Sequence, residues 1–309
     1  MKNIILLPLA LLSLLFVGCD VESPMSKDLY PQLVYIVGAP DKIIDRDLNI
    51  GHLPADTVSI SVAVSGSRPT SQDVTVTLGE DSTAIQTYDT KNLSALVTQY
   101  RKLANGIYSY PSTKLTIKAG QVYNTFPIYI KPTTFHCDSL YMLPLKLTST
   151  SAFKLIQTDT VALVRINMVN NYSGLYNMYG VIRNTTNAKD TVVYKMARNL
   201  QATDNGQTVR MYHYKNEFVQ GDITDYRPTY ALKMTVNADN TLSFATWKDF
   251  ALIAGGGKYY PNLKLYDFWY TFTEGTVIKK TVGYLYKTRS ITAEQRMIDD
   301  WIEDHPLAK

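Results

Sequence analysis

The fold is decided by the stretch VSISVAV, residues 58–64, in which a β-branched residue stands at every second position. A period of two is typical of a strand that has one face in a core and the other toward solvent. Similar alternation returns at residues 74–78, 143–147 and 162–168. β-branched residues at this spacing, bounded by turns, predict an antiparallel β-sandwich.

The aromatic content of the sequence changes around Asn170. Fourteen of the 23 Tyr and all three Trp lie beyond it. Period-two segments after this point predict a meander of strands over residues 175–183, 191–202, 208–214, 230–236, 241–247, 263–273 and 277–287. A last amphipathic segment predicts a helix over 292–303, capped by Thr292.

These patterns predict an all-β chain of two domains. We expect an N-terminal Ig-like β-sandwich domain over 31–169. We expect a Tyr- and Trp-rich domain over 170–309, formed by an antiparallel β-meander as a sandwich or barrel, with a short C-terminal helix.

Three local features bear on this architecture. Apolar residues spaced three and four apart predict one helix over 93–103, inside the sandwich domain. Pro144 lies within a predicted strand, which favours an edge position or a bulge. The run GGGK at 255–258 lacks the Ser or Thr of a phosphate-binding loop and predicts a flexible loop.

The beginning of the chain has the pattern of an export signal. The apolar run at 4–17 is too short to span a bilayer but suits a signal-peptide core. It ends in LFVGC at 15–19, which resembles a bacterial lipobox. We expect a lipoprotein signal peptide over 1–18, lipidation of Cys19 and a tether over 19–30. The protein is then lipid-anchored in the outer membrane and exposed at the cell surface; the alternative is a plain secretory signal.

Charge and metal-ligand spacing exclude several classes of function. With 31 Lys and Arg against 27 Asp and Glu, the net charge is only +4, so we expect no nucleic-acid partner. His136, Cys137 and Asp138 are consecutive, and neighbours on a strand point to opposite faces, so they do not form one metal site. We expect no metal and no cofactor.

The sequence offers little for catalysis. Glu217, Asp222 and Asp225 cluster in one polar segment and are candidates for a glycosidase carboxylate pair. Acidic residues in loops are much more often solvated than catalytic. We therefore predict that the protein is not an enzyme, and we name no catalytic residue. A glycosidase is the most distant alternative.

Aromatic residues on polar strand faces are the better candidates for a binding site. A sugar ring packs its C–H face on an aromatic ring, and carboxylates and hydroxyls bind its hydroxyl groups. The candidates for glycan binding are Trp247, Trp269, Asp267, Tyr259, Tyr260, Tyr226 and Tyr230. The alternative is that both faces of this sheet are covered, with the two Trp in the core. Trp301, on the apolar stripe of the last helix, is expected to dock that helix.

Short segments in both halves resemble a known pair of domains. LTIKAG at 115–120 and YMLPLKLT at 141–148 look like the domain of unknown function 1735, found in Bacteroidetes surface lipoproteins. The closing stretch, residues 268–289, looks like the partner domain of unknown function 4361. The resemblance implies an Ig-like sandwich followed by a β-rich domain, often encoded in polysaccharide-utilisation loci. It implies no catalytic residues.

We therefore predict a non-catalytic surface lipoprotein that binds a polysaccharide or other glycan through aromatic platforms. Its partners are then carbohydrate, the membrane through the lipid anchor, and outer-membrane transporter proteins. The alternative is a structural, accessory or adhesion subunit of an outer-membrane complex, in which the same aromatic residues contact protein.

Overall fold

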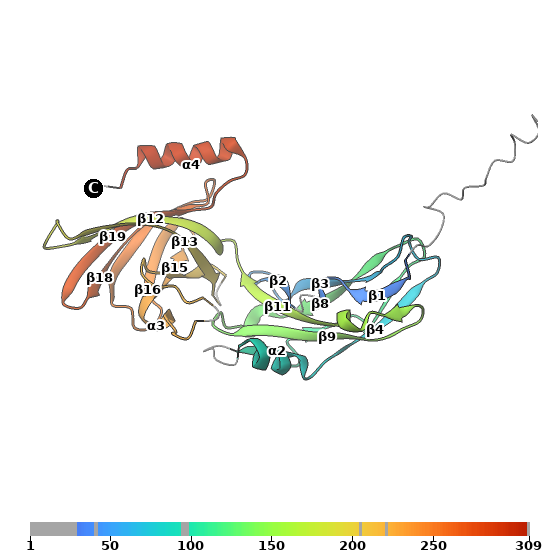
Figure 1. The fold of residues 1–309 in the computed structure, drawn as a ribbon. Helices are drawn as coiled ribbons and strands as arrows, with labels where there is room; N and C mark the ends of the chain where they lie inside the picture. Colours follow the sequence, from blue (N-terminus) through green and yellow to red (C-terminus); the bar gives the residue numbers. More distant parts are fainter. Residues whose placement is uncertain (1–29, 40–42, 94–98, 204–205, 220–221, 308–309) are drawn as a thin grey trace, which may run out of the picture.

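A computed structural model of the chain describes residues 30–39, 43–93, 99–203, 206–219 and 222–307. Figure 1 shows two bodies in a row: an elongated sandwich built before residue 170, and a rounded barrel built after it. Cys19 and the predicted signal peptide lie outside the described residues.

The sandwich consists of two facing sheets. The strands of one are, in order, β10 (Lys154–Leu155), β1 (Leu33–Ile36), β3 (Asp56–Val64), β8 (Tyr123–Ile130) and β6 (Tyr108–Ser109). The strands of the other are β2 (Ile43–Asn49), β11 (Val161–Val169), β9 (Leu140–Thr150), β4 (Val74–Glu80) and β7 (Lys114–Ile117), and β5 (Tyr100–Lys102) pairs with β9. Most pairs are antiparallel, but β10, β2 and β5 each pair in parallel with a neighbour.

The alternation of apolar and small polar residues in β3 matches the alternation of buried and less buried side chains along the strand. Val58, Ile60, Val62 and Val64 face the space between the two sheets, where they join an aliphatic core. Apolar side chains from both sheets are removed from water there, which stabilises the fold by about 1.5–3 kcal/mol for each large residue. The predicted sandwich is confirmed.

The helix predicted over 93–103 is wrong. The helix of this region is α2 (Ala84–Asn92), and Leu93 ends it. Tyr100 instead begins β5, where its N–H donates to the Asp89 carboxylate at 3.0 Å. Pairing with β9 satisfies the backbone of this segment, so tertiary contacts override the helical spacing. Leu96 and Val97, which belong to the predicted stripe, lie outside the described residues.

Pro144 lies in an interior strand, so the edge alternative is wrong. The register of β9 against β4 does shift, but opposite Thr77 and Leu78 rather than at Pro144. β9 has β11 on one side and both β4 and β5 on the other. The Pro144 carbonyl accepts from the Asp81 N–H at 2.9 Å, on the β4 side. The nitrogen of a strand residue points to the same side as its carbonyl, so the missing N–H of Pro144 falls in the gap between β4 and β5.

The second body is a closed barrel of eight antiparallel strands. They run in chain order: β12 (Gly174–Asn184), β13 (Thr191–Ala202), β14 (Thr208–Tyr212), β15 (Ala231–Val236), β16 (Thr241–Thr246), β17 (Leu252–Tyr260), β18 (Leu265–Glu274) and β19 (Val277–Tyr286). β19 pairs with β12 and closes the barrel. The predicted meander is confirmed, except that β17 was not predicted.

The glycine run that was predicted as a loop belongs to β17. A Cβ on Gly255 would lie 2.8 Å from the Phe244 Cβ, and one on Gly257 would lie 2.1 Å from the Asp267 carbonyl oxygen. Glycine is therefore needed because side chain and backbone from the flanking strands occupy the space of a Cβ. Without side chains the segment has no alternation, which is why the strand pattern failed here.

Two helices accompany the barrel, α3 (Arg227–Tyr230) and α4 (Thr292–Asp304). α4 lies across the outside of the barrel (Figure 1). Its residue Ile298 is fully buried against Leu265 and Tyr284. The helix begins at Thr292 with no side-chain cap bond, so the predicted cap is wrong. Within the described ranges, no helix is long and apolar enough to cross a membrane.

Aromatic side chains fill the inside of the barrel. Tyr176, Tyr266, Phe268 and Tyr270 are all buried there. His213 lies among them, with its Nδ1 2.6 Å from the Tyr270 hydroxyl. Burial lowers the pKa of His213 to about 3, so this imidazole is neutral at physiological pH. The interior is a packed core rather than a ligand chamber.

The two bodies meet on the outer side of β14. Every residue of this strand is buried, because one face lines the barrel and the other meets the sandwich. Asp138 of the sandwich forms ion pairs with both Arg210 and Arg227 of the barrel domain. Hydrogen bonds also link the bodies: the Gln201 side chain donates to the Met168 carbonyl at 3.2 Å.

Candidate functional site

Three of the predicted glycan-binding residues lie on one outer side of the barrel. Along β18, Tyr266, Phe268 and Tyr270 point inward, so Asp267 and Trp269 point outward. Tyr260, at the end of β17, also points outward, and Trp301 of α4 lies beside it. We call these four residues, Tyr260, Asp267, Trp269 and Trp301, the barrel–helix face.

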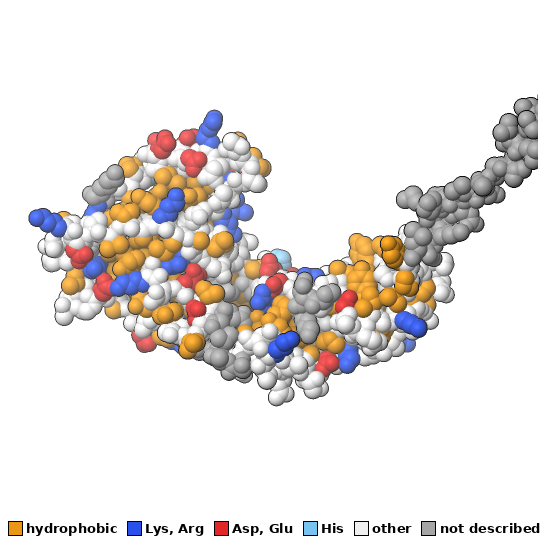
Figure 2. All heavy atoms as spheres, viewed as in Figure 1, with side chains coloured by type: hydrophobic (Ala, Val, Ile, Leu, Met, Phe, Trp, Pro, Cys, Tyr) orange, Lys and Arg blue, Asp and Glu red, His pale blue; other side chains and the backbone are white. Residues whose placement is uncertain are grey.

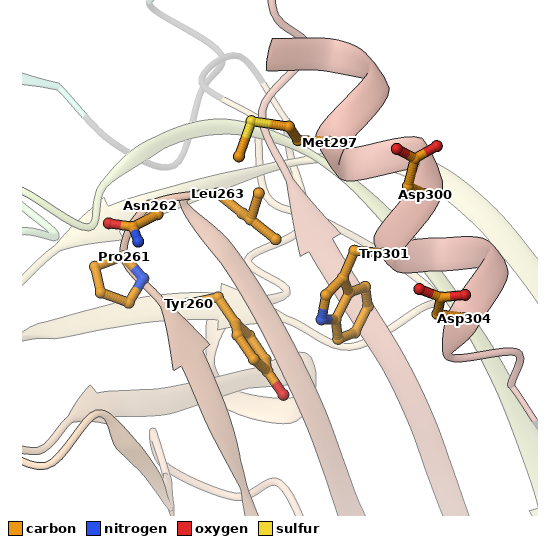
Figure 3. A pocket seen from close by; sticks show the side chains of 8 residues that line it. All are labelled: Tyr260, Pro261, Asn262, Leu263, Met297, Asp300, Trp301 and Asp304. Atoms are coloured by element: carbon orange, nitrogen blue, oxygen red, sulfur yellow. The ribbon is translucent and has the colours of Figure 1, made fainter. Parts of the chain in front are cut away.

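A cavity of about 470 Å³ opens where α4 meets the turn between β17 and β18. Figure 3 shows Tyr260 and Trp301 side by side in it, with their ring centroids 5.2 Å apart. Asp300 and Asp304, one helical turn apart on α4, add two carboxylates to its wall. An aromatic surface with neighbouring carboxylates can receive both faces of a sugar, the apolar C–H face and the hydroxyls.

Trp269 is the exposed ring of the barrel–helix face. It is 38% exposed, and its indole lies over Gly256 of β17, whose missing Cβ would be 3.3–3.4 Å from the ring. The Lys280 ammonium lies 5.0 Å from the ring centroid. Because the neighbouring strand carries no side chain here, a wide indole can lie flat on a rigid surface. Figure 2 shows hydrophobic side chains gathered over the barrel below α4.

Asp267 lies between Trp269 and the cavity. Its cross-strand neighbours are Lys258 and Tyr284, and it is half-buried. Burial raises the pKa of the Asp267 carboxyl, and the charge of His305 acts in the opposite direction. Burial and the Asp267 charge together raise the pKa of the Tyr260 hydroxyl, which remains a protonated hydrogen-bond donor.

Trp301 is held from several sides. Its ring stacks on His305 at 4.3 Å and meets Tyr284 edge-on at 6.2 Å. The indole therefore docks the end of α4, as the sequence predicts, and also lines the cavity. Trp301, Asp300 and Asp304 were missing from the predicted site. The sequence did contain a signal for them: the three residues are spaced one, three and four apart, which places them on one face of the predicted helix.

Trp247 lies elsewhere, at the junction of the two bodies. The residue follows β16 and is half-buried, with Arg210 5.2 Å and Lys233 5.3 Å from its ring centroid. His136 of the sandwich domain lies 6.2 Å away. Cations and the neighbouring domain surround this ring, so the structure does not bring Trp247 together with Trp269.

The adjacent Tyr259 and Tyr260 are separated by strand geometry. Tyr259 points into the barrel, where it is buried against Tyr172 and Tyr266 at 5.3 and 4.7 Å. Its neighbour Tyr260 points out to the cavity. Tyr259 is therefore a core residue, because the triple glycine and both tyrosines belong to one strand, in which adjacent side chains point to opposite faces.

Tyr226 directly precedes α3, and Tyr230 is the last residue of this helix. Both are half-buried, and their ring centroids lie 6.1 Å apart in an edge-on pair. No interaction joins them to the barrel–helix face in the part of the chain that the structure describes. They form a separate small aromatic pair.

The acids considered for a glycosidase are engaged by neighbours. Glu217 accepts from Arg198 at 3.3 Å, and Asp225 accepts from Arg227 at 2.8 Å. Burial acts to raise the pKa of Asp225, but hydrogen bonds and charge from Arg227 outweigh it and lower that pKa. Asp222 accepts from the Val219 N–H at 2.8 Å. Two of the three carboxylates are thus paired with buried guanidinium groups rather than aimed at each other.

Asp138, part of the consecutive His136–Asp138 run, serves the domain junction through its pairs with Arg210 and Arg227. Among the residues that the structure describes, no group of three or more His, Cys, Asp or Glu side chains is placed to hold a metal ion.

Two family models match the chain, one for each body. Residues 30–154 match a model described as an N-terminal domain, and residues 160–286 match one described as the C-terminal domain. The chain carries the two domains in that order. No curated protein matches it.

Solved structures from Bacteroides share this two-domain fold. A Bacteroides ovatus protein of unknown function is 20% identical with a TM-score of 0.59, over 82% of this chain and 94% of that one. A multidomain Bacteroides ovatus protein including the domain of unknown function 1735 is 18% identical with a TM-score of 0.57, over 79% and 89%.

A third similar structure is described as an auxiliary nutrient binding protein, from Bacteroides thetaiotaomicron. It is 19% identical with a TM-score of 0.57, over 84% of this chain and 95% of that one. One of these similar structures, the multidomain Bacteroides ovatus protein, includes domain 1735. The resemblance of the closing stretch to domain 4361 remains a prediction.

Proposed function

We propose that the protein binds carbohydrate without catalysis, on the barrel–helix face. The observation that carries this proposal is Trp269, an exposed indole that lies over the glycine of the next strand and has Asp267 two positions away on the same face. A flat exposed ring with an adjacent carboxylate offers the two contacts that a pyranose needs, one for its C–H face and one for its hydroxyls.

The spacing along the face suits more than one sugar. Residues two apart in a strand are separated by about 6.8 Å, so Trp269 and Asp267 lie about one pyranose apart. The cavity with Tyr260, Asp300 and Asp304 continues the surface beyond Asp267. A chain of sugars with one unit on Trp269 reaches the cavity with the next units. The nutrient-binding description of the Bacteroides thetaiotaomicron structure supports a binding role.

The cellular setting is part of the same proposal. The lipobox-like segment supports lipidation at Cys19 and display at the outer membrane, where transporter proteins are the natural recipients of a captured glycan. Metabolic labelling with a fatty-acid analogue, lost in Cys19→Ser, tests the anchor.

The binding proposal is tested by calorimetric titration of the chain from residue 20 onward against a panel of polysaccharides. We expect one polysaccharide to bind, and Trp269→Ala to weaken it about tenfold or more, because ring stacking is worth about 1 kcal/mol beyond area burial. Tyr226→Ala is the matched control, since this aromatic ring lies off the face and its loss leaves affinity unchanged. Absence of binding to the whole panel contradicts the proposal.

A second candidate function is a protein-binding subunit of an outer-membrane complex. It is favoured by exposed aliphatic side chains on the outside of the barrel, Val193, Ile253 and Ile278. Large apolar side chains that are exposed in the isolated chain become buried when a protein partner covers them. Cross-linking from membranes distinguishes the two: capture of a defined partner that is lost in Ile253→Ser and Ile278→Ser, with Trp269→Ala unaffected, supports the subunit role.

A further inference from the structure

A second cavity, of about 400 Å³, lies between the two bodies and belongs to neither site described above. Its wall combines the outer side of β13 and β14 with the end of the sandwich at Asp138 and Leu140. Three guanidinium groups line it, those of Arg165, Arg210 and Arg227, against the carboxylates of Asp138 and Glu217. The volume matches a small ligand of one or two rings.

The carboxylate of Asp138 is shared at this cavity. Both Arg210 and Arg227 pair with it, and Arg227 has a second partner in Asp225 at 2.8 Å. Asp138 is the only carboxylate that pairs with Arg210 in the described residues, although Arg210 is only 6% exposed. A guanidinium offers five N–H donors, so one shared carboxylate leaves donors of Arg210 unmatched.

Two buried polar atoms confirm that the cavity wall has spare hydrogen-bonding capacity. The Nε of Arg210 and the hydroxyl of Tyr212 have no hydrogen-bond partner among the described residues. Tyr212 is 2% exposed and also lines the cavity. A buried polar group without a partner costs about 1–3 kcal/mol, so a bound acceptor offsets that cost.

Burial raises the pKa of the Tyr212 hydroxyl, against the opposing charges of Arg210 and Arg227. The hydroxyl therefore stays protonated at neutral pH and can donate. Donors thus outnumber acceptors at this wall, which favours an anionic oxygen over a neutral one.

The rest of the wall fits the body of a sugar. Leu175 and Phe218 give it an apolar part, and the amides of Asn199 and Gln201 give it polar groups suited to hydroxyls. The Arg227 guanidinium lies 4.5 Å from the Phe218 ring centroid, so the charged and apolar parts are adjacent.

We propose that this interdomain cavity binds the carboxylate end of an acidic sugar, a hexuronic acid or a residue of one in a glycan. The carboxylate accepts from the Tyr212 hydroxyl and the Arg210 guanidinium, and the sugar ring lies toward Leu175 and Phe218. The site is independent of the barrel–helix face, so either proposal can fail without the other.

The test is calorimetric titration of the protein with glucuronate, galacturonate, glucose and inorganic phosphate. We expect one of the two uronates to bind and glucose to bind at least tenfold more weakly, because only the uronates carry the charge. Tyr212→Phe removes one hydroxyl and no packing, and we expect it to weaken the uronate about tenfold or more.

The matched control is Tyr176→Phe, which removes the hydroxyl of another buried tyrosine, inside the barrel and away from this cavity. We expect uronate affinity to be unchanged in Tyr176→Phe and in Trp269→Ala. The proposal is overturned if neither uronate binds, if phosphate or glucose binds as tightly as the uronates, or if Tyr212→Phe binds them like the unaltered protein.

Discussion

The sandwich and the barrel solve the same packing problem with different side chains. The sandwich core is formed almost entirely by Val, Ile, Leu and Met, with Phe126 and Phe135 as its buried phenylalanines. The barrel core is dominated by Tyr and Phe. Two facing sheets lie about 10 Å apart, a gap that interdigitating aliphatic chains fill, whereas a closed eight-stranded barrel encloses a wider space that needs long rings.

A core rich in tyrosine requires hydrogen-bond partners for its buried hydroxyl groups. Tyr270 meets His213, Tyr194 meets Thr281 at 2.8 Å, and Tyr266 donates to a backbone carbonyl at 3.0 Å. Buried hydroxyls need such partners, so the aromatic core carries a polar network that the aliphatic core lacks. The tyrosine enrichment of the second half is therefore mainly structural: of its fourteen tyrosines, seven are buried and none is fully exposed.

The largest expected difference between the bodies is their response to acid. The pKa of His213 is lowered by burial to about 3 in the folded barrel, whereas an unfolded histidine has a pKa of about 6.5. Between these values only the unfolded chain binds the proton, so the free energy of unfolding falls as pH falls through this window. The loss reaches about 4 kcal/mol by pH 3 and falls below about 0.5 kcal/mol above pH 6.5.

Denaturant unfolding of the barrel at pH 7 and pH 4 measures this effect. The variant His213→Gln removes the titrating group, so its stability should change less between the two pH values, by about 3 kcal/mol. His136→Gln, at an exposed histidine of the sandwich domain, serves as the control. Equal pH dependence in all three proteins contradicts a neutral buried His213.

The next largest effect concerns the aromatic core itself. Tyr270→Ala removes a fully buried ring and leaves a cavity, so we expect the barrel to lose about 3–5 kcal/mol of stability. Val62→Ala, at an equally buried position of the sandwich, removes only two methyl groups and should cost about 1–2 kcal/mol. Thermal unfolding followed by tyrosine fluorescence and circular dichroism gives both values. Similar losses in the two variants refute the ring-filling explanation.

A smaller effect tests how firmly the two bodies are joined. Asp138→Ala leaves Arg210 and Arg227 without their shared carboxylate at the junction. We expect a loss of about 2–3 kcal/mol, below the range for a fully buried pair because the Asp138 side chain is 16% exposed. Calorimetry should show two separate unfolding transitions in the variant where the native protein shows more closely coupled ones. A single unchanged transition means that the junction is held by other contacts.

The smallest effect on stability is expected at the outer surface. Gly256→Ala adds a methyl group 3.3–3.4 Å from the Trp269 indole, so the ring must tilt away from the strand. Stability should change by no more than about 1 kcal/mol. Glycan affinity should nevertheless fall several-fold, and titration against the bound polysaccharide measures it. Thr271→Ala, which also points outward on β18, is the control; an equal loss there means that the flat seating of Trp269 is not what binds the sugar.

Most of the fold could be predicted from the alternation of apolar and polar residues in the strands. This alternation located β3 and seven of the eight barrel strands, because each has one face in a core and side chains that report it. It missed β17, where Gly255, Gly256 and Gly257 have no side chains to alternate. A different pattern, apolar residues spaced three and four apart, produced the false helix at 93–103, since helical spacing does not reveal that β9 offers a pairing partner to Tyr100.

The site was predictable only where strand parity decided it. Parity placed Asp267 and Trp269 correctly on one outer face. It failed for Trp247, which lies past the end of β16 and meets another domain, a contact that no local pattern contains. The cavity beside Tyr260 depends on where α4 crosses the barrel, and the interdomain cavity on how two domains meet. Both follow from tertiary arrangement rather than from spacing along the chain.

The order of the two bodies along the chain has a mechanical consequence. The described chain enters at β1, at the end of the sandwich away from the barrel (Figure 1). Strand β9 has 11 residues and extends about 37 Å along the sandwich toward the barrel. Any attachment made through the N-terminal segment thus places the sandwich, a rigid domain of about this length, between the attachment point and the barrel. The ion pairs of Asp138 join the two domains at the end nearer the barrel. Such an attachment would hold the barrel away from its support and leave the outer surface of the barrel open to long polymers that cannot approach the support itself.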